Sequence, residues 1–361
     1  MNILSSFFSE DLAIDLGTVN TLIYAPGRGV VLEEPSAVAI HKYTGEVLAA
    51  GREAFKMVGR EPKDVEVHRP VKNGTIENFE ATEKMLGCFI RQVQGDHLKR
   101  SHMVIGVPGS STTIEQRSVR DAARDAKAVR VDLVDEGLCA ALGEGLNYED
   151  ERAHLVVDVG GGTTNVAIVA NGAIVASTSL KVAGNAMDEA IREYVRSHHE
   201  MQIGVRTAEQ VKIQLGAGLP EGAGDKREEP RRMELIGKEV TTGLAKVVEL
   251  TSDEVREALE PVLSEIVAFA RRTVEDSQPE VTADIYQTGL LLTGGGALLQ
   301  GFAERLQQEL RLHVAVAEEP LAAVALGAGR LLSDPERLNR ASIREDVPAW
   351  RASEEQLVVN W

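Results

Sequence analysis

The sequence predicts an α/β fold built by duplication, in which each half carries a sheet covered by helices. The first reason is a strand–turn–strand pattern that occurs twice, at residues 12–24 and 155–169. Each copy has a short apolar strand, an Asp-x-Gly turn and a second apolar strand. The second reason is that strand-like and helix-like apolar patterns alternate along both halves, and the third is a length of 361 residues, which is enough for two large domains. We expect a ligand to bind in the crevice between the halves.

The first half is predicted from apolar residues at two different spacings. Short apolar runs indicate strands, and apolar residues three and four positions apart indicate helices. The predicted elements are strands with turns over 11–50, a helix over 77–95, a strand over 103–107, a helix from about 112, a strand over 131–134 and a helix over 138–145. The helix near 112 opens with Thr112 and Glu115, which have the spacing of a capping box.

The second half follows the same logic. Its predicted elements are the second repeat from 154, helices over 186–199 and 207–215, a hairpin over 233–250, a helix over 252–276, a strand over 290–292 and a further helix. Thr207 and Gln210 suggest a capping box for the second of these helices. In the last helix we expect Leu298 and Phe302 to face inward. Residues 217–232 read as a loop, and the polar tail after about 333 is expected to be loosely held.

Charge and composition exclude several classes. The net charge of −17 argues against a general nucleic-acid binder, which needs a basic surface to neutralise phosphates. The sequence has no apolar run of the ~18 residues that span a bilayer, and its N-terminus lacks the features of a secretory signal. Cys88 and Cys139 stand in apolar, helix-like segments, so we expect two buried free thiols in a reducing cytoplasm.

Three glycine motifs follow apolar strands and together favour a polyphosphate site. They are Asp15-x-Gly17, Asp158-x-Gly160-Gly161-Gly162-Thr163 and Gly294-Gly295-Gly296. Glycine lets backbone N–H groups approach phosphate oxygens, the two Asp side chains can hold a hydrated Mg²⁺, and a helix after the last motif would favour an anion. One such motif alone would more simply be a tight bend. Neither the P-loop spacing nor G-x-G-x-x-G is present, which argues against a P-loop ATPase or an NAD enzyme.

This pattern resembles the superfamily of actin, sugar kinases and heat-shock chaperone ATPases, and within it the MreB family of bacterial actins that determine rod shape. The resemblance runs from about residue 10 to 332. It is carried by Ile14-Asp15-Leu16-Gly17-Thr18, Glu33-Glu34-Pro35-Ser36, Arg69-Pro70-Val71-Lys72-Asn73-Gly74, Thr82-Glu83-Lys84-Met85-Leu86, Val157-Asp158-Val159-Gly160-Gly161-Gly162-Thr163-Thr164, Met187-Asp188-Glu189-Ala190-Ile191, Leu292-Thr293-Gly294-Gly295-Gly296-Ala297-Leu298-Leu299 and Val324-Ala325-Leu326-Gly327-Ala328-Gly329.

The resemblance implies a duplicated actin-like (ribonuclease H-like) fold, with a larger and a smaller subdomain in each half around a nucleotide cleft. The implied parts are subdomain IA (11–33, 66–150 and 314–332), IB (34–65), IIA (151–185 and 251–313) and IIB (186–250). Residues 1–10 are a candidate amphipathic membrane anchor, and residues 333–361 form the polar tail.

The resemblance also implies a role for each site residue, with ATP and Mg²⁺ as ligands. The phosphates would lie between two turns, Gly17, Thr18, Val19 and Asn20 on one side and Gly160, Gly161, Gly162 and Thr163 on the other. Asp15 and Asp158 would hold Mg²⁺ through water, and Glu136 would orient the attacking water. The ribose and base would be contacted by Glu209, Gln210, Val211, Lys212, Gly295, Gly296, Ala297 and Leu298. Without the resemblance, Glu136 and Glu209 would be read as solvated carboxylates at helix ends.

Four residues depart from the usual pattern of the family. Gly137 stands where Pro is usual, Asn165 and Gln214 stand where Glu is common, and Asn185 stands where Asp is common. Gly137 is expected to loosen the segment that presents Glu136. We therefore expect ATP binding to be kept and ATP hydrolysis to be slow.

The resemblance further implies self-assembly and a peripheral position on the inner face of the cytoplasmic membrane. MreB-like proteins form head-to-tail protofilaments that pair antiparallel, and they work with membrane proteins of the cell-wall synthesis machinery. The candidate membrane contacts are Ile3, Leu4, Phe7 and Phe8 on one helical face, and Leu98 in a basic loop. The simpler interpretations are a frayed N-terminus and an ordinary surface loop.

Three other interpretations stay open at this point. A metabolic kinase of the same fold would need a sugar or acid pocket with a catalytic base, for which the sequence has no signature. A chaperone-type ATPase would need a C-terminal peptide-binding domain, for which residues 333–361 are too few. A specialised or divergent actin-like paralogue is compatible with the four departures.

Overall fold

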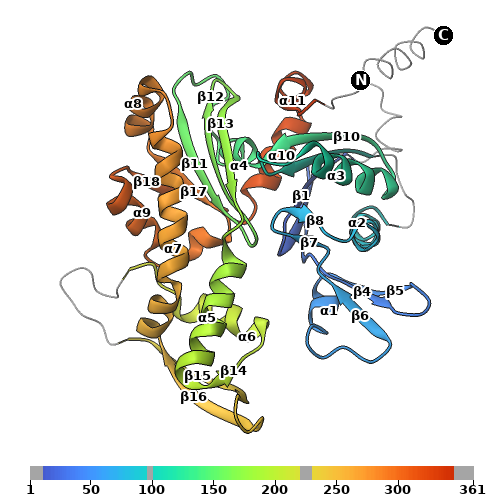
Figure 1. Ribbon diagram of the computed structural model, residues 1–361. Coiled ribbons are helices and arrows are strands. Elements are labelled where there is room, and N and C mark those ends of the chain that lie inside the picture. The colour runs from blue at the N-terminus through green and yellow to red at the C-terminus, as the bar shows by residue number, and fades with distance from the viewer. Residues whose placement is uncertain (1–10, 96–100, 220–229, 345–361) are drawn as a thin grey trace.

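The computed structural model describes residues 11–95, 101–219 and 230–344. The proposed membrane residues Ile3, Leu4, Phe7, Phe8 and Leu98 lie outside these ranges. Two five-stranded sheets, each in its own half of the molecule, form the framework (Figure 1). We call the half that contains residues 11–145 the first half and the half that contains residues 154–316 the second half.

The two large sheets have the same strand order. The first is β3-β2-β1-β9-β10 and the second is β13-β12-β11-β17-β18. In both, the first strand of the repeat pairs antiparallel with the next strand and parallel with a strand from much later in the chain. The strands are β1 (Leu12–Leu16), β2 (Asn20–Ala25), β3 (Gly29–Pro35), β9 (Ser101–Val107), β10 (Ala128–Asp135), β11 (His154–Val159), β12 (Thr164–Ala170), β13 (Ala173–Leu180), β17 (Leu290–Thr293) and β18 (Val314–Val316). The predicted duplicated α/β fold is confirmed.

Helices cover both faces of the first sheet, because successive side chains of a strand point to opposite faces. Leu12 and Ile14 pack with Met85 and Phe89 of α2 (Phe79–Gln94) and with α3 (Thr113–Asp125). Ala13 instead packs with α4 (Glu136–Gly143) and α10 (Ala323–Leu332). The predicted capping box of α3 forms, since Thr112 accepts from the N–H of Glu115.

The helices α7 (Ser252–Glu275), α8 (Pro279–Thr288) and α9 (Phe302–Leu310) contact the second sheet. The helices α5 (Gly184–His199) and α6 (Val205–Leu215) pack against each other and against α7. The largest core of the protein lies here, between α5, α7 and the strands of the repeat. Of the two cysteines, Cys139 is buried as predicted, whereas Cys88 is only partly buried; both are free thiols.

A three-stranded sheet extends each half at the lower end of the view in Figure 1. In the first half, β4 (Val38–His41), β5 (Val47–Ala50) and β6 (Val65–His68) form a sheet beside α1 (Arg52–Phe55), and β7 (Val71–Lys72) pairs with β8 (Thr75–Ile76). In the second half, β14 (Met201–Gln202), β15 (Arg232–Glu239) and β16 (Ala245–Thr251) form the corresponding extension. The predicted hairpin over 233–250 is β15–β16.

On the first sheet, α4 packs closely against α10. A Cβ atom added at Gly143 would overlap with the backbone of Ala323, and one added at Gly327 would overlap with the backbone of Cys139. The two helices therefore pack backbone against backbone. Glycine is required at both positions for this close approach.

The start of α6 differs from the predicted one. The helix begins at Val205 after Gly204, and no side chain caps it. Thr207 and Gln210 lie inside the helix, so the expected capping box does not form. The earlier start could not be predicted, because the N-cap residue is Gly204, which has no side chain to mark the beginning of a helix.

The segment after the last glycine motif also differs from the prediction. Gly295–Leu298 forms a 3₁₀ turn, η2, and α9 begins only at Phe302. We expected a helix N-terminus directly after the motif, where it would favour an anion. The helix N-terminus instead lies at Phe302, six residues after Gly296. Leu298, predicted to face inward, is 61% exposed, whereas Phe302 is buried as predicted.

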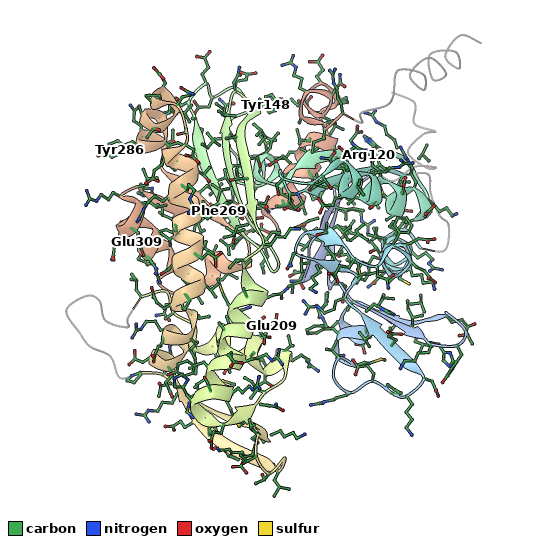
Figure 2. The ribbon with its side chains drawn as sticks, viewed as in Figure 1. Arg120, Tyr148, Glu209, Phe269, Tyr286 and Glu309 are labelled. Atoms are coloured by element: carbon green, nitrogen blue, oxygen red, sulfur yellow. The ribbon has the colours of Figure 1, made fainter. Side chains whose placement is uncertain are left out.

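Residues 333–344 are held in place, contrary to the expected loose tail. The helix α11 (Pro335–Ala341) buries Leu338, and the N–H of Ile343 donates to the carbonyl oxygen of Leu133 (2.8 Å). Arg120, labelled in Figure 2, donates to the carbonyl oxygen of Ile343 (2.8 Å). Residues 345–361 lie outside the described part.

Candidate functional site: a cleft between the two halves

A cavity of about 570 Å³ lies between the two halves. Its volume is in the range of small-molecule sites. Most of the predicted site residues line it: Asp15, Gly17, Thr18, Val19, Asn20, Glu136, Asp158, Gly160, Gly161, Gly162, Thr163, Glu209, Lys212, Gly295, Gly296 and Leu298. Gln210, Val211 and Ala297 do not line it. Gln210 is exposed and Val211 is in the core, because they point away from the cavity on either side of α6.

The turns after β1 and β11 touch across the cavity. A Cβ atom added at Gly161 would overlap with the side chain of Val19, and one added at Gly162 would lie 2.5 Å from the Thr18 Oγ1 atom. The Thr18 hydroxyl also accepts from the N–H of Gly74 (3.0 Å). Because Gly161 and Gly162 have no side chains, the backbone N–H groups of their turn are accessible to an anion held between the halves.

Carboxyl groups gather at the floor of the cavity. Burial raises the pKa of Asp15 to about 7, and the charge of Asp158 adds to this rise. Burial also raises the pKa of Asp158 to about 6, although a hydrogen bond from Asn165 opposes the rise. Asp15 keeps some contact with solvent whereas Asp158 is buried, so the shift of Asp15 is an upper limit. A cation bound between the two carboxylates would offset their repulsion.

Glu136 is the first residue of α4, and its position is fixed by its neighbours. Asp135 caps the helix by accepting from the N–H groups of Gly137 (2.8 Å) and Leu138 (3.3 Å). Burial raises the pKa of Glu136 well above its usual value, and the charges of Asp15, Asp158 and Asp135 add to the rise.

Gly137 tightens this segment, contrary to the expected loosening. Its N–H donates to Asp135, a hydrogen bond that Pro could not make. A Cβ atom at this position would also overlap with the Cβ of Ala167 on β12. The glycine therefore lets α4 approach the second half closely.

The other end of the cavity is formed by α6 and the last glycine motif. Glu209, labelled in Figure 2, comes from α6, and Lys212 one turn later pairs with the buried Asp188 (2.8 Å). Gln214, one of the four departures from the family pattern, is exposed and does not line the cavity. Exposed apolar side chains at Ile213 and Leu298 face this end and could cover the flat surface of a base.

Several lining residues were not predicted. They are Leu16, Leu22, Gly74, Gly184, Met187, Ile213, Gly216, Arg231, Leu299, Gln300, Pro320, Leu321 and Val324. Gly74 and Met187 stand within segments that carried the family resemblance, which was the available signal. Arg231 and Gln300 gave no local signal, because tertiary folding alone brings them to the cavity.

A second contact between the halves lies at the mouth of the cleft. Arg206 of α6 donates to the carbonyl oxygen of Lys56 (3.3 Å), and its guanidinium lies 5.7 Å from the centre of the Phe55 ring. Arg69 approaches the same ring at 6.0 Å. Phe55 is thus held by guanidinium groups from both halves.

The described residues 11–95, 101–219 and 230–344 contain no cluster of three or more His, Cys, Asp or Glu side chains able to hold a metal ion. Two carboxylates at the cavity floor match the way Mg²⁺ is usually bound together with phosphates and water. A metal ion between Asp15 and Asp158 would therefore need further ligands such as water or phosphate oxygens.

The fold and the cleft define an actin-like protein. The solved structure of the MamK double helical filament has the same fold, with a TM-score of 0.74 at 22% identity over 90% of this chain and 99% of that one. MreB5 of Spiroplasma citri bound to ADP is more similar, with a TM-score of 0.84 at 32% identity over 92% of this chain and 98% of that one. A second structure of MreB5, bound to AMPPNP, gives the same TM-score of 0.84 at 33% identity.

The chain belongs to the MreB/Mbl protein family, whose model matches residues 9–340. The cell shape-determining protein Mbl of Bacillus cereus is 40% identical over 338 residues, which is 93% of this chain and 100% of that protein. The cell shape-determining protein MreB of Escherichia coli K12 is 41% identical over 331 residues, which is 90% of this chain and 94% of that protein. The predicted family is confirmed, and a kinase or a chaperone ATPase is not favoured.

Proposed function

We propose that the protein is an ATP-binding, filament-forming bacterial actin that organises cell-wall synthesis and maintains rod shape. The observation that carries this proposal is the cavity lined by glycine turns of both halves, with Asp15 and Asp158 at its floor. The MreB/Mbl membership supports the cellular role. A ligand in this cavity would touch both halves at once, so its binding energy would favour the closed arrangement.

Nucleotide binding would use backbone groups more than charged side chains. The turns at Gly17–Asn20 and Gly160–Thr163 would hold the phosphates, and Glu209 and Lys212 would lie near the ribose and base. The MreB5 structures bound to ADP and AMPPNP, at 32% and 33% identity, support nucleotide binding by this chain. Mg²⁺ would neutralise phosphate charge, and Asp15 and Asp158 would hold its water shell.

Hydrolysis would depend on Glu136, the carboxylate at the start of α4. This side chain would orient a water molecule in line with the γ-phosphate and accept one of its protons. The water oxygen would form the new bond to phosphorus as the bond to the leaving ADP oxygen breaks. Burial and the charges of Asp15, Asp158 and Asp135 raise the pKa of Glu136, which disfavours the ionised form that accepts the proton. We therefore keep the proposal that hydrolysis is slow.

Self-association would involve the β15–β16 hairpin. Ile236 and Val247 face each other across the two strands and are 67% and 56% exposed, and Leu244 at the turn is 70% exposed. A group of exposed apolar side chains on one tip of the molecule is typical of an interaction surface. We propose a second copy of this chain as its partner, in head-to-tail protofilaments that pair antiparallel.

Attachment to the inner face of the cytoplasmic membrane would be peripheral. Within the described residues, no helix is long and apolar enough to cross a bilayer. Ile3, Leu4, Phe7, Phe8 and Leu98 remain the proposed contact residues. The expected partners at the membrane are membrane proteins of the cell-wall synthesis machinery.

The test is nucleotide binding and assembly of the purified protein. We expect a fluorescent ATP analogue to bind in the presence of Mg²⁺ and to bind at least tenfold more weakly to Asp158→Asn, while Asp64→Asn, an exposed control, is unchanged. Electron microscopy with Mg-ATP and lipid should show paired filaments, which Val247→Glu should lose without losing nucleotide. Absence of nucleotide binding in the parent protein, or filaments that Val247→Glu leaves intact, would contradict the corresponding part of the proposal.

The membrane contact is tested separately by sedimentation with anionic liposomes. Replacing Phe7 and Phe8 with Ser should reduce the bound fraction, because the apolar face of the segment is lost. Equal sedimentation of the variant and the parent protein would remove this contact from the proposal.

A further inference from the structure

Asn165 makes a buried contact with Glu136 from the opposite half of the molecule. The Asn165 Nδ2 atom donates to the Glu136 Oε2 atom at 2.6 Å. The two residues are 3% and 8% exposed, so water does not compete for this bond. A donor to an ionised carboxylate makes one of the stronger classes of hydrogen bond. The carboxylate is thereby held on one oxygen, and its other oxygen remains for a ligand or water.

The reach of Asn165 depends on how close α4 comes to β12. Ala167 lies two residues after Asn165 on the same strand, so both side chains point to the same face. That face meets α4 at Gly137, where a Cβ atom would overlap with the Cβ of Ala167. The missing side chain at Gly137 therefore sets the separation at which the short Asn165 side chain contacts Glu136.

The duplicated half shows that the fold itself does not require an amide here. Asn165 pairs with Asp158 across β11 and β12, and the position of the same register in the first half, opposite Asp15, is Leu22. Leu22 is buried at 3% exposure. Among the described residues, the Asn165 Oδ1 atom is buried without a hydrogen-bond partner, which destabilises the fold. Leucine at this position would avoid the cost of the unpaired Asn165 oxygen, so the presence of an amide indicates a role other than packing.

We infer that Asn165 is a positioning residue for hydrolysis, which holds Glu136 across the two halves at a separation set by Gly137. This inference rests on the proposed hydrolysis of ATP at Glu136. It also connects two of the departures from the family pattern. A carboxylate at position 165 would repel Glu136, whereas the amide donates to it, and the close approach at Gly137 brings the amide within reach.

The test separates nucleotide affinity from the chemical step. The parent protein and Asn165→Leu, which copies the side chain of the first half, are compared in single-turnover hydrolysis and in equilibrium binding of an ATP analogue. We expect the hydrolysis rate to fall about tenfold or more, because a displaced catalytic group loses its alignment. The dissociation constant should rise by much less than the rate falls, although Asn165 also donates to Asp158. Asn165→Asp has nearly the same shape but no N–H donor, and it should lower the hydrolysis rate in the same way. It replaces Asn165→Leu if that variant does not fold.

The role of Gly137 is tested by a compensating pair. Gly137→Ala should lower the hydrolysis rate, because its Cβ forces α4 away from Ala167. Adding Ala167→Gly removes the overlapping atom and should restore most of the rate, whereas Ala167→Gly alone should leave it unchanged. In a Glu136→Gln background, Asn165→Leu should have no further effect, since its action passes through Glu136.

The outcomes distinguish this inference from the proposed function. A parent protein that binds ATP and does not hydrolyse it refutes the hydrolysis proposal, and the inference with it. A parent protein that hydrolyses ATP at a rate unchanged in both Asn165 variants refutes the inference alone. An equal loss of rate from Asn165→Leu with and without Glu136→Gln also overturns it, because the effect would then not pass through Glu136.

Discussion

Replacing Asp15 with Asn is expected to stabilise the nucleotide-free protein while weakening its binding of Mg-nucleotide. In the folded chain, burial and the charge of Asp158 raise the pKa of Asp15 from 3.8 to about 7. The folded state therefore holds the proton more tightly than the unfolded state. The contribution of Asp15 to the free energy of unfolding is therefore highest below about pH 4 and falls as the pH rises through about 7.

The magnitude follows from the shift. A rise from 3.8 to about 7 corresponds to about 4 kcal/mol at pH 8, with one pKa unit equal to about 1.4 kcal/mol. This is an upper limit, because Asp15 keeps some contact with water in the cavity. A chain of 361 residues has an unfolding entropy of about 0.8 kcal/mol per degree, so the variant should unfold up to about 5 °C higher than the parent at pH 8. At pH 4 the difference should nearly vanish.

The assay is thermal unfolding of nucleotide-free protein in chelator, at several pH values between 4 and 8. Asp64→Asn, at an exposed position, serves as the control and should not change the midpoint. Adding Mg-ATP at pH 8 should raise the midpoint of the parent more than that of Asp15→Asn. A variant that is less stable than the parent at pH 8, or equally more stable at pH 4 and pH 8, would refute the reasoning.

Three further changes test other contacts. Gly161→Ala should weaken binding of a fluorescent ATP analogue about tenfold or more, because a side chain would stand between the two turns, and unchanged binding would contradict this geometry. Lys212→Met should destabilise the protein by about 3 kcal/mol in urea unfolding, because it leaves the buried carboxylate of Asp188 unpaired, and Asp188→Asn in the same chain should recover part of the loss. Gly327→Ala should lower the unfolding midpoint, at a cost of about 1–3 kcal/mol, because its Cβ overlaps with the backbone of Cys139; a neutral effect would show that the two helices can separate freely.

Features encoded in short segments could be predicted from the sequence. The two strand–turn–strand units were predicted because the apolar strand, the Asp and the Gly stand within a few residues of each other, as Asp15 and Gly17 do in the first copy. The capping box of Thr112 and Glu115 formed as predicted for the same reason. The order of the strands could not be predicted in this way, because β1 pairs with β9 from a distant part of the chain.

The predictions that proved wrong involve contacts between the two halves, or helix ends that no capping side chain marks. Gly137 was expected to loosen the segment that presents Glu136, because glycine has a flexible backbone. In the folded protein Gly137 instead lies where α4 packs directly against Ala167. Glu136 and Asn165 are 29 residues apart and lie in different halves, so no local pattern could reveal their hydrogen bond. Leu298 followed a helical period that the chain abandons in the η2 turn.

The close contact of α4 with β12 has a mechanical consequence. Since Gly137 has no side chain, α4 of the first half lies directly against Ala167 of the second half, and this contact can act as a pivot between the halves. A small rotation about this pivot would move α1 and α6, which lie far from it in Figure 1, by a larger distance than it moves the cavity, and it would change the contact of Phe55 with Arg206. A neighbouring molecule that binds there would therefore favour one arrangement of the cavity, without a change in the sheets themselves.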